Sequence, residues 1–460
     1  MGALRKDFPL LDNGENIPPH KKFLFLEYVE AVLFAVVIAL VIRHFVLQVY
    51  VIPTGSMAPT LNGKHVEIVC SNCGFTFGYG FRQSTYHTAE CPICHTQNST
   101  RDKRIQGGDR LFSAQFLFLL RAPRRWEPFV FRFPGDPTKD FIKRLVGLPG
   151  DALEIRNGDI YVNGHIQTKP LDVQERAWIP VYDSRFIPAD RTRFWKSESS
   201  GWSEVEGLLV ADASREEREV IASFARPVRD FYGYDQPGQS GFNFVGDLKL
   251  SFDFVASGEG GGYVRATIRE VTLAREKDTS LRGGKTYSDE FLLSLPVNRP
   301  EEKASLSVPG FNENVTVATG YPIVSGRKVH IDFLNYDDRI LVRMDGKVLF
   351  DVQLEERSPR PYRTQNARVA LEANGLKVEF SYVQIFRDIF YIGATHTDEG
   401  NDYMSRVGEI VTIPDGHYFA LGDNSPISQD SRVWGLIPKN IVEGKAFLVF
   451  WPPKRWRFIR

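Results

Sequence analysis

One uninterrupted apolar run near the N-terminus limits what this chain can fold into more than any other feature. Residues 23–42 read FLFLEYVEAVLFAVVIALVI and carry only two charged side chains, Glu27 and Glu30. Twenty residues of helix are about 30 Å long, which is the thickness of the hydrocarbon core of a bilayer. The sequence therefore predicts one transmembrane helix over residues 23–42, behind a short cytoplasmic N-terminus of residues 1–22.

Basic residues around this run predict its orientation. Arg5, Lys6, Lys21 and Lys22 precede it, and only Arg43 follows closely. This bias predicts a single-pass anchor in the cytoplasmic (inner) membrane, with the N-terminus inside and everything downstream on the extracytoplasmic side. A cleaved signal peptide is an alternative, although no A-x-A-like site follows the run. A buried core helix is a second alternative.

Composition describes the remainder as globular. Hydrophobic residues make up 42% and charged residues 25% of 460 residues, which excludes a polytopic membrane protein and a disordered chain. Lys+Arg 57 balance Asp+Glu 57, so a general nucleic-acid-binding surface is not expected. Aromatic residues at 13% favour β-rich, buried cores.

Two short segments carry residues suited to nucleophilic catalysis. Ser56 stands on a Pro-Thr-Gly-Ser turn after the extended Tyr50–Ile52 segment, and Lys143 lies in the apolar, strand-like run FIKRLV. Most serines in such turns are only turn formers, and most lysines are solvated. A lysine buried among apolar groups, however, loses hydration of its charged form, so its pKa falls and it can accept a serine proton.

Three segments resemble successive signature boxes of bacterial signal peptidase I. They are PTGSMAPTL, IKRLVGLPGD and GDNSPISQDSRVWGLIPKNIVEGK, in the order of the family and behind an apolar helix. With their flanks they cover about residues 23–69, 101–171 and 388–455. The resemblance implies a membrane-bound Ser/Lys endopeptidase that cleaves signal peptides from exported preproteins. It needs no cofactor for catalysis.

Roles of individual residues follow from this resemblance. Ser56 matches the nucleophile, Lys143 the general base, and Ser428 the serine that orients the lysine. Thr54 is the expected side-chain donor of the oxyanion hole. Structural ion pairs near the site are expected between Arg144 and Asp423 and between Asp430 and Arg432.

The same resemblance implies an extended substrate beside the Tyr50–Ile52 and Asp140–Ile142 strands. Tyr50, Ile52 and Ile142 are the expected substrate-binding residues, although they could equally be ordinary core residues. One box departs from the family, because Trp126-Glu127 stands where the family usually has Gly-Asp. The turn before the Pro128 strand is therefore left open.

All four cysteines lie in one short segment, with the spacing C-x2-C-x17-C-x2-C. Cys70, Cys73, Cys91 and Cys94 could hold one structural Zn²⁺ in a ribbon, and four thiolate ligands would leave no open catalytic position. Two disulfides are an alternative on the extracytoplasmic side. Haem attachment through the Cys-Pro-Ile-Cys-His run is a third, but it leaves Cys70 and Cys73 unexplained.

A long insertion separates the second and third boxes. Residues 176–202 read as irregular, and alternating strands follow at Leu248–Phe254, Val329–Phe333, Ile340–Met344 and Val378–Tyr382, with a hairpin at Asp345-Gly346. The segment NYDDRILVRMDGKVLFD resembles concanavalin-like and laminin-G-like jelly rolls. A β-sandwich is expected, which either binds a carbohydrate or protein ligand or is an inert spacer.

The expected fold is thus mainly β, with nested domains. They are an N-terminus at 1–22, an anchor at 23–42, a catalytic domain at 43–69, 101–171 and 388–460, a zinc-ribbon-like insertion at 70–100 and a jelly-roll-like β-sandwich at 172–387. Self-cleavage by the same dyad is a second enzymatic hypothesis. A membrane-anchored surface-binding protein with a vestigial peptidase is the alternative from another class.

Overall fold

The computed structural model describes residues 20–41, 47–80, 87–214, 219–234, 241–274, 285–309, 315–316, 322–354, 363–393 and 409–459. It divides into two compact units, residues 1–48 and 49–460. The expected N-terminal segment 1–22 lies outside the described residues except for its last three. The helix expected over residues 23–42 is present as α1 (His20–Val41), whose described side chains are those of 27–38.

None of the described helices combines the length and the apolar character that a membrane crossing needs. The large apolar side chains described on α1 are exposed, namely Tyr28, Val29, Val32, Leu33, Phe34, Val36, Val37 and Ile38.

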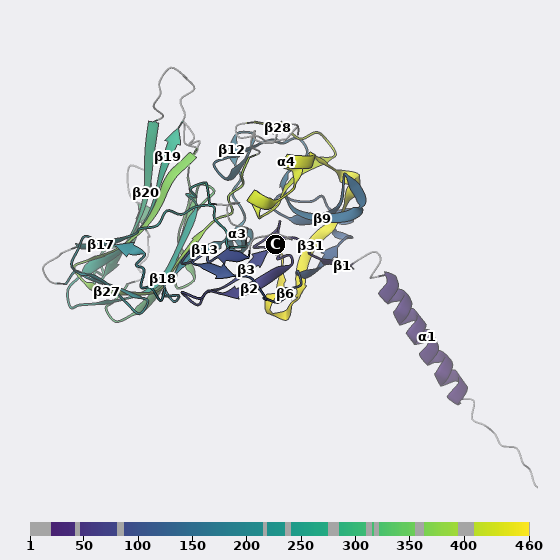
Figure 1. Cartoon of the computed structure of the whole chain (residues 1–460), viewed down its shortest axis with the longest axis horizontal. Coiled ribbons are helices and arrows are strands. Elements are labelled where there is room, and N and C mark those ends of the chain that lie inside the picture. Colours follow the sequence, from purple (N-terminus) through teal and green to yellow (C-terminus); the bar gives the residue numbers. More distant parts are fainter. Residues whose placement is uncertain are drawn as a thin grey trace, which may run out of the picture. The chain divides into compact units, whose positions relative to one another are not determined.

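An eight-stranded sheet carries the segments with the signature boxes. Strands close to the N-terminus and the C-terminus of the second unit lie side by side in it, as the blue and yellow strands of Figure 1 show. The order is β1 (Leu47–Val51), β7 (Arg110–Ala114), β31 (Val442–Trp451), β8 (Pro128–Phe133), β9 (Asp136–Gly147), β29 (His417–Leu421) and β30 (Ile437–Pro438), with β32 (Arg457–Phe458) paired to β31.

A four-stranded sheet packs beside it and shares its core. Its order is β12 (His165–Ile166), β11 (Asp159–Val162), β10 (Ala152–Arg156) and β28 (Val411–Thr412). The hairpin between β11 and β12 turns at Asn163 and Gly164, which both have positive φ, as the two-residue turns of twisted hairpins require. Val146 of β9 and Phe419 of β29 join Leu153 and Ile160 in one buried cluster.

The cysteine segment forms two small antiparallel sheets. One has the order β3 (Thr76–Gly80), β2 (His65–Val69) and β6 (Ile105–Gln106), and the other pairs β4 (Thr88–Glu90) with β5 (Gln97–Ser99). Val66, Ile68, Phe77 and Ala89 pack with the cysteines in a separate small core.

The insertion is a sandwich of two antiparallel sheets, in agreement with the expected β-sandwich. One sheet has the order β15 (Trp202–Val205), β16 (Leu208–Asp212), β27 (Lys377–Arg387), β18 (Leu248–Ser257), β23 (Lys328–Tyr336), β24 (Arg339–Met344) and β25 (Lys347–Gln353), with β13 (Ile179–Asp183) also on β27. The other has the order β14 (Trp195–Lys196), β17 (Glu219–Phe224), β26 (Arg363–Asn374), β19 (Gly262–Ala274), β20 (Lys285–Val297), β21 (Ser305–Ser307) and β22 (Val315–Thr316).

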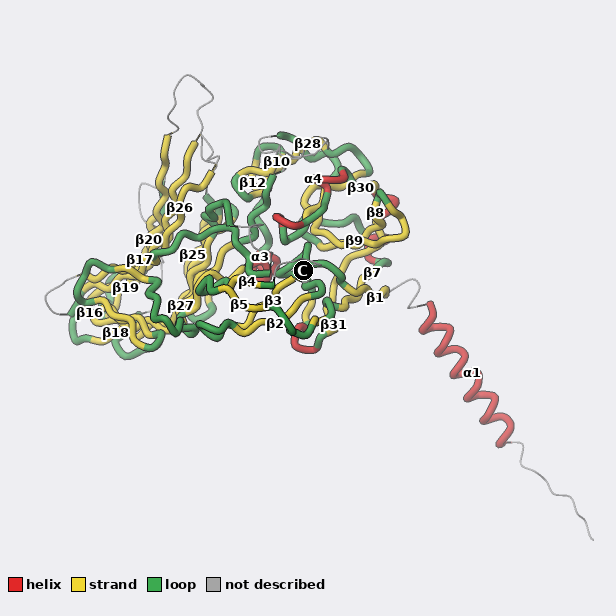
Figure 2. The backbone as a smooth tube through the Cα atoms, viewed as in Figure 1, coloured by secondary structure: helices red, strands yellow, loops and turns green. Residues whose placement is uncertain are grey.

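Alternating side chains explain why these strands form a sandwich. Leu250, Phe252 and Phe254 of β18 are fully buried, and they meet Val264 and Leu293 of the facing sheet in the largest core of the chain. The predicted hairpin at Asp345-Gly346 joins β24 to β25, with φ of 50° and 77°. Strands dominate the described chain, and the helices are few and short apart from α1 (Figure 2).

The expectation that residues 176–202 are irregular is wrong in part. This segment contains β13, which pairs with β27, and the two-residue strand β14, and it begins at the end of α3 (Leu171–Ala177). Trp178 and Trp195, whose charged and proline-containing surroundings suggested a loop, are buried. Their burial comes from long-range pairing that local sequence does not reveal.

A buried cluster of charges joins the four-stranded sheet to the sandwich. Lys169 Nζ lies 2.7 Å from Asp337 Oδ1 and 2.8 Å from Asp388 Oδ2. Carboxylate oxygens of Asp159, Asp247 and Asp337 lie within 4.8 Å of one another. Burial, followed by the negative charges of Asp247 and Asp337, raises the pKa of Asp159 well above its usual range. Lys169 and the carboxylates of Asp159, Asp247, Asp337 and Asp388 are called the acidic junction below.

Candidate active site

Two residues far apart in the sequence meet at the first sheet. The Lys143 amine donates a hydrogen bond of 2.6 Å to the Ser56 hydroxyl. Ser56 follows the end of β1 on a turn, whereas Lys143 lies within β9, directly opposite Phe129 of β8. Because β9 is held between β8 and β29, the lysine has little freedom to leave the serine.

Lys143 is buried, with 4% of its surface exposed. Burial lowers its pKa to about 8, and the positive charge of Arg432 adds to this effect. Negative charge on Asp430 and Asp423 opposes it and keeps the pKa from falling further. A substantial fraction of the amine is thus neutral near pH 8, which a general base for a serine hydroxyl requires.

The third signature box holds the Ser56 turn in place. The Asn424 N–H donates to the Ser56 carbonyl oxygen at 3.0 Å. A Cβ at Gly422 would lie 2.4 Å from that same oxygen and 2.2 Å from Ser428 Oγ, so only glycine fits here. Asn424 was not singled out from the sequence, although the GDNS motif contains it.

Ser428 lies at the site but does not make its expected hydrogen bond. Its hydroxyl is buried, and within the described residues it has no hydrogen-bond partner. Orientation of Lys143 by Ser428 therefore stays a prediction. The expected oxyanion-hole residue, Thr54, has an exposed side chain on the turn before Ser56.

A cleft of about 440 Å³ opens over the Ser56–Lys143 pair. Tyr50 and Ile52 line it from the β1 side and Ile142 from the β9 side, and Ile52 is 4% exposed. Its remaining lining residues are Val51, Pro53, Thr54, Val130, Asp140, Phe141, Ile427 and Gln429. The Tyr50 hydroxyl donates to Glu443 Oε2 at 2.8 Å, which turns its polar end away from the apolar floor.

Both expected ion pairs form beneath the site. Arg144 donates twice to Asp423, at 2.6 Å from Nε and from Nη2, and its Nη1 donates to the Trp126 carbonyl oxygen. Arg432 likewise donates twice to Asp430, at 2.8 and 2.7 Å. All four residues are buried, and none of them lines the cleft. The Arg144–Asp423 pair joins the third box to β9, whereas the Arg432–Asp430 pair lies within the third box.

The chain turns at Trp126-Glu127, although the glycine and aspartate usual in the family are absent there. Trp126 has a φ of +73°, a conformation that glycine adopts without strain. Glu127 accepts hydrogen bonds from the side chains of Arg121 and Lys445 and from the Arg124 N–H. The Trp126 N–H donates to the Leu145 carbonyl oxygen and the Leu145 N–H to the Glu127 carbonyl oxygen, and these two bonds hold the turn against β9.

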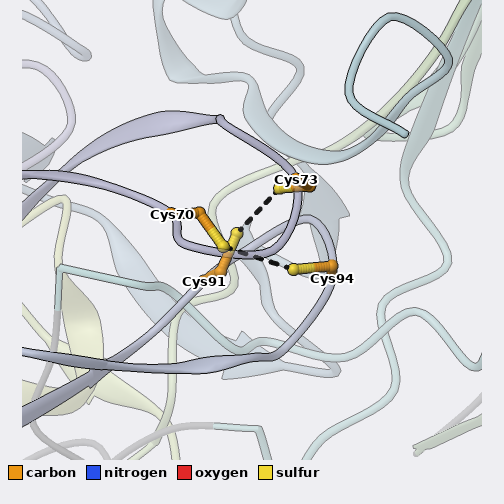
Figure 3. A group of neighbouring side chains, drawn as sticks. All are labelled: Cys70, Cys73, Cys91 and Cys94. Atoms are coloured by element: carbon orange, nitrogen blue, oxygen red, sulfur yellow. Dashed lines mark hydrogen bonds between the residues drawn. The ribbon is translucent and has the colours of Figure 1, made fainter. Parts of the chain in front are cut away.

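The four cysteine sulfurs converge on one point (Figure 3). Cys70 and Cys94 Sγ are 3.5 Å apart, and Cys73 and Cys91 Sγ are 3.7 Å apart. Four thiolates around one Zn²⁺ would be separated by about 3.8 Å, given Zn–S bonds of about 2.3 Å. All four are free cysteines, so the structure does not contain the two disulfides that were the alternative to zinc.

Two turns of the same design present these sulfurs. Cys70 N donates to Phe75 O and Gly74 N to Cys70 O, and the second turn repeats the pattern with Cys91 N to Thr96 O and His95 N to Cys91 O. Gly74 and His95 occupy equivalent positions with positive φ. His95 Nδ1 forms a hydrogen bond with Glu90, so this ring nitrogen already has a partner.

Comparisons with known proteins agree on one family. The family described as "Signal peptidase, peptidase S26" matches residues 25–193 and 337–451. Signal peptidase I of Pseudomonas aeruginosa is 31% identical over 157 residues, which cover 34% of this chain and 44% of that protein. Probable signal peptidase I-2 of Synechocystis sp. is 27% identical over 237 residues, which cover 44% of this chain and 84% of that protein.

The chain thus spans less than half the length of the Pseudomonas relatives that it matches. Among solved structures, a Bacillus subtilis protein of unknown function with a galectin-like fold covers 45% of this chain and 96% of its own. It is 11% identical, with a TM-score of 0.31, which is too low to suggest a ligand for the sandwich.

Proposed function

This chain belongs to the signal peptidase family S26, and we propose on that basis that it is a serine endopeptidase that cleaves signal peptides from exported preproteins. The observation that carries the proposal is the hydrogen bond of 2.6 Å between the Lys143 amine and the Ser56 hydroxyl. A buried lysine whose pKa is lowered to about 8 can act as base, where a solvated lysine could not.

The proposed reaction proceeds in two steps. Neutral Lys143 takes the Ser56 proton while Ser56 Oγ attacks the scissile carbonyl carbon, and the peptide bond breaks to leave an acyl group on Ser56. The leaving amine takes a proton from the Lys143 ammonium. Lys143 then accepts a proton from water, whose oxygen attacks the acyl carbon. The bond from this carbon to Ser56 Oγ breaks, Lys143 returns the proton to Ser56 Oγ, and the signal peptide leaves with a new carboxylate.

Charge that develops on the carbonyl oxygen needs donors beside Ser56. The Ser56 N–H and the Thr54 hydroxyl are proposed for this role, because both belong to the turn that borders the cleft. Ser428 is proposed to donate to, or accept from, the Lys143 amine once substrate is bound. Its buried hydroxyl, which has no hydrogen-bond partner among the described residues, is packed against Gly422 beside the Ser56 carbonyl, which supports this proposal.

The substrate is proposed to bind as an extended strand in the cleft. Among the described strands, β1 pairs only with β7, so its other edge can accept a further strand. The apolar side chains of Ile52 and Ile142 would receive small substrate side chains, as in the A-x-A pattern. A cleft of about 440 Å³ holds only a few residues, which favours selection by short side chains.

Location at the cytoplasmic (inner) membrane, with the catalytic domain on the extracytoplasmic side, is proposed from α1. Its support is the apolar run of residues 23–42 and the exposure of eight large apolar side chains on α1. Such a surface in water would be unfavourable, whereas a lipid bilayer would cover it. Resistance of the protein in membranes to extraction at alkaline pH would support the anchor, and complete extraction would disprove it.

A structural Zn²⁺ is proposed for the ribbon, held by Cys70, Cys73, Cys91 and Cys94. The support is the convergence of four free thiols at separations close to those around zinc, on two matching turns. Haem attachment to Cys91 and Cys94 is disfavoured, because Cys70 and Cys73 occupy the same cluster. Bound zinc would link the two turns and stabilise the segment, without contacting the cleft.

Cleavage of a preprotein by the full chain tests the proposed function. We expect wild type to release the signal peptide, and Ser56→Ala and Lys143→Ala to lower kcat at least 1,000-fold, an order of magnitude typical for loss of a catalytic group. Lys139→Ala is the matched control, since Lys139 lies on the same strand but is exposed. Cleavage by either dyad variant at the wild-type rate would refute the mechanism.

The alternatives make different predictions in the same assay. Self-cleavage would shorten the wild type when it is incubated alone. A surface-binding protein with a vestigial peptidase would cleave nothing, and the close Ser56–Lys143 pair gives that alternative no support.

A further inference from the structure

A tyrosine from the insertion lies directly behind the nucleophile. Tyr234, in the loop after β17, is 2% exposed, and its ring covers Gly55, the residue before Ser56. A Cβ at Gly55 would lie 2.2 Å from Tyr234 Cε1 and 3.0 Å from Cδ1. The ring therefore occupies the space that any side chain at residue 55 would need.

A second close contact restricts the peptide before Gly55. A Cβ at Gly63 would lie 2.2 Å from the Thr54 carbonyl carbon and 2.7 Å from the Gly55 nitrogen. The peptide that joins Thr54 to Gly55 is thus packed closely by the backbone of Gly63, while the Tyr234 ring packs against Gly55. This peptide can shift only if one of these neighbours moves.

Strands of the cysteine segment hold Tyr234 in place. The Gly80 N–H, at the end of β3, donates to the Tyr234 carbonyl oxygen at 2.8 Å, and a Cβ at Gly80 would lie 2.5 Å from Tyr234 Cε1. The His65 ring of β2 lies 6.0 Å from the Tyr234 ring. Tyr234 is consequently packed between two elements: strands β2 and β3, and the turn that carries Ser56.

The loop that carries Tyr234 also contacts the cysteine cluster. Arg226 Nη1 donates to the Ile93 carbonyl oxygen at 2.9 Å, between Cys91 and Cys94. The Phe231 ring lies 5.1 Å from the His95 ring, and a Cβ at Gly233 would lie 2.9 Å from Pro92 Cδ. The loop of residues 226–234 therefore contacts the second cysteine turn through Arg226, Phe231 and Gly233, and it contacts Gly55 through Tyr234.

We propose that Tyr234 is a positioning residue for the nucleophile, supplied by the insertion and held by the cysteine segment. Its ring fixes the Gly55 peptide, and thereby the direction of the Ser56 N–H and the distance from Ser56 Oγ to Lys143. A displacement of about 1 Å at a reacting atom can lower a rate 100-fold. This inference rests on the proposed peptidase activity, and it gives both insertions a role in that activity.

Removal of the ring tests the proposal in the full chain. We expect Tyr234→Ala to lower kcat for preprotein cleavage roughly 10- to 100-fold with KM changed less than about threefold. Tyr234→Phe keeps the ring and should restore most of the rate. Tyr182→Ala is the matched control, because Tyr182 is as well buried, at 4% exposure, but lies in the sandwich core. It should lower the melting temperature while kcat stays within about twofold.

A reciprocal substitution separates direct contact from general loss of stability. Gly55→Ala alone should lower kcat at least 100-fold, because its Cβ would overlap the Tyr234 ring. In the Tyr234→Ala background, the same substitution should lower kcat less than about threefold, since the space is then free. Additive effects of the two substitutions, or an equal loss of kcat in Tyr182→Ala, would overturn the proposal.

Amide hydrogen exchange provides a readout that does not depend on cleavage. In Tyr234→Ala, amides of residues 54–63 should exchange at least 10-fold faster than in wild type, and in Tyr182→Ala they should not. Unchanged exchange of these amides in Tyr234→Ala overturns the positioning role, whatever the cleavage assay gives. An inactive wild type with faster exchange in Tyr234→Ala would instead refute the proposed function and leave the contact intact.

Discussion

Lys143 Nζ and Ser56 Oγ lie 2.6 Å apart, and the lysine that makes this contact is almost completely buried on a central strand. Burial of an amine has two opposite effects on the protein. It makes the neutral, basic form accessible, and it makes the charged form unfavourable in the folded state. Activity and stability should therefore both depend on the protonation of this single group.

Activity should rise with pH as Lys143 loses its proton. The pKa lowered to about 8 places this rise between about pH 7 and 9. Below it, kcat/KM should fall about tenfold for each pH unit, since only the neutral amine accepts the Ser56 proton. Initial rates of preprotein cleavage from pH 6 to 10 measure this limb. A flat profile across pH 7–9 would contradict the assignment of Lys143 as base.

Replacement of Lys143 by methionine should stabilise the protein while it abolishes cleavage. Between about pH 8 and 10.5 the unfolded chain keeps the lysine proton that the folded chain has lost, so the wild type gains stability as pH rises. Below pH 8 the wild type carries the full penalty, roughly 3 kcal/mol. Lys143→Met should thus unfold at a higher temperature at pH 7 and show no gain at pH 11.

Thermal unfolding of Lys143→Met, wild type and Ser56→Ala over this pH range checks the previous expectation. Ser56→Ala removes catalysis but leaves the buried amine, so its stability should follow the wild type at every pH. A pH-independent gain for Lys143→Met would show that packing, and not the charge, is responsible.

The two hydroxyls beside the dyad should contribute unequally. Thr54→Val removes a proposed oxyanion donor with little change in volume and should lower kcat roughly 100- to 1,000-fold, which is 3–4 kcal/mol. Thr54→Ser keeps the hydroxyl and should retain most of the rate. Ser428→Ala should lower kcat about 10-fold and move the pH limb, because the loss acts through Lys143. If the pH dependence of cleavage by Ser428→Ala matched that of the wild type, Ser428 would not act through Lys143.

The cysteine cluster should contain one zinc ion per chain. Metal analysis of purified protein measures this, and Cys73→Ser should lose the metal because three thiolates bind it more weakly. Chelation should expose four thiols to a thiol reagent and lower the free energy of unfolding by several kcal/mol. Metal-free protein without titratable thiols would favour two disulfides instead.

The charge on Asp159 in the acidic junction should lower the free energy of unfolding at neutral pH. The raised pKa of Asp159 means that its carboxylate is unfavourable in the folded state above that pKa, and that the penalty fades as pH falls through it. Asp159→Asn should raise the free energy of unfolding at pH 7.5, and raise it less at pH 4.5, as thermal unfolding at the two pH values would measure. Asp136→Asn should give no gain, because the side chain of Lys139 and the hydroxyl of Thr138 stabilise its exposed carboxylate and lower its pKa.

Local patterns were sufficient for the parts of the site that lie in motifs. The turn at Ser56 and the apolar strand around Lys143 are each short enough to be recognised alone, and the cysteine spacing predicts its own cluster. The alternation of β18 and the Asp345-Gly346 hairpin likewise predicted the sandwich, since periodicity and turn chemistry are local.

Contacts between distant segments could not be predicted in this way. Gly55 reads as an ordinary turn glycine, and nothing near Tyr234 indicates that its ring covers that glycine. The conformation of the turn at Trp126 could not be predicted, because a tryptophan rarely adopts a positive φ. Here the backbone bonds to Leu145 and the partners of Glu127 hold it in that conformation. Burial of Trp178 depends on the pairing of β13 with β27, which lies beyond local sequence.

The hydrogen bond between Asn424 and Ser56 affects when, during synthesis, the candidate active site can form. Ser56 is synthesised well before Asn424, because the whole sandwich is made between them. At translation rates of about 5–20 residues per second, the segment that contains Asn424 is synthesised on the order of tens of seconds after Ser56. A nascent chain that has not yet reached Asn424 therefore lacks one contact of the turn that carries Ser56, and the site can form completely only after the sandwich has been synthesised.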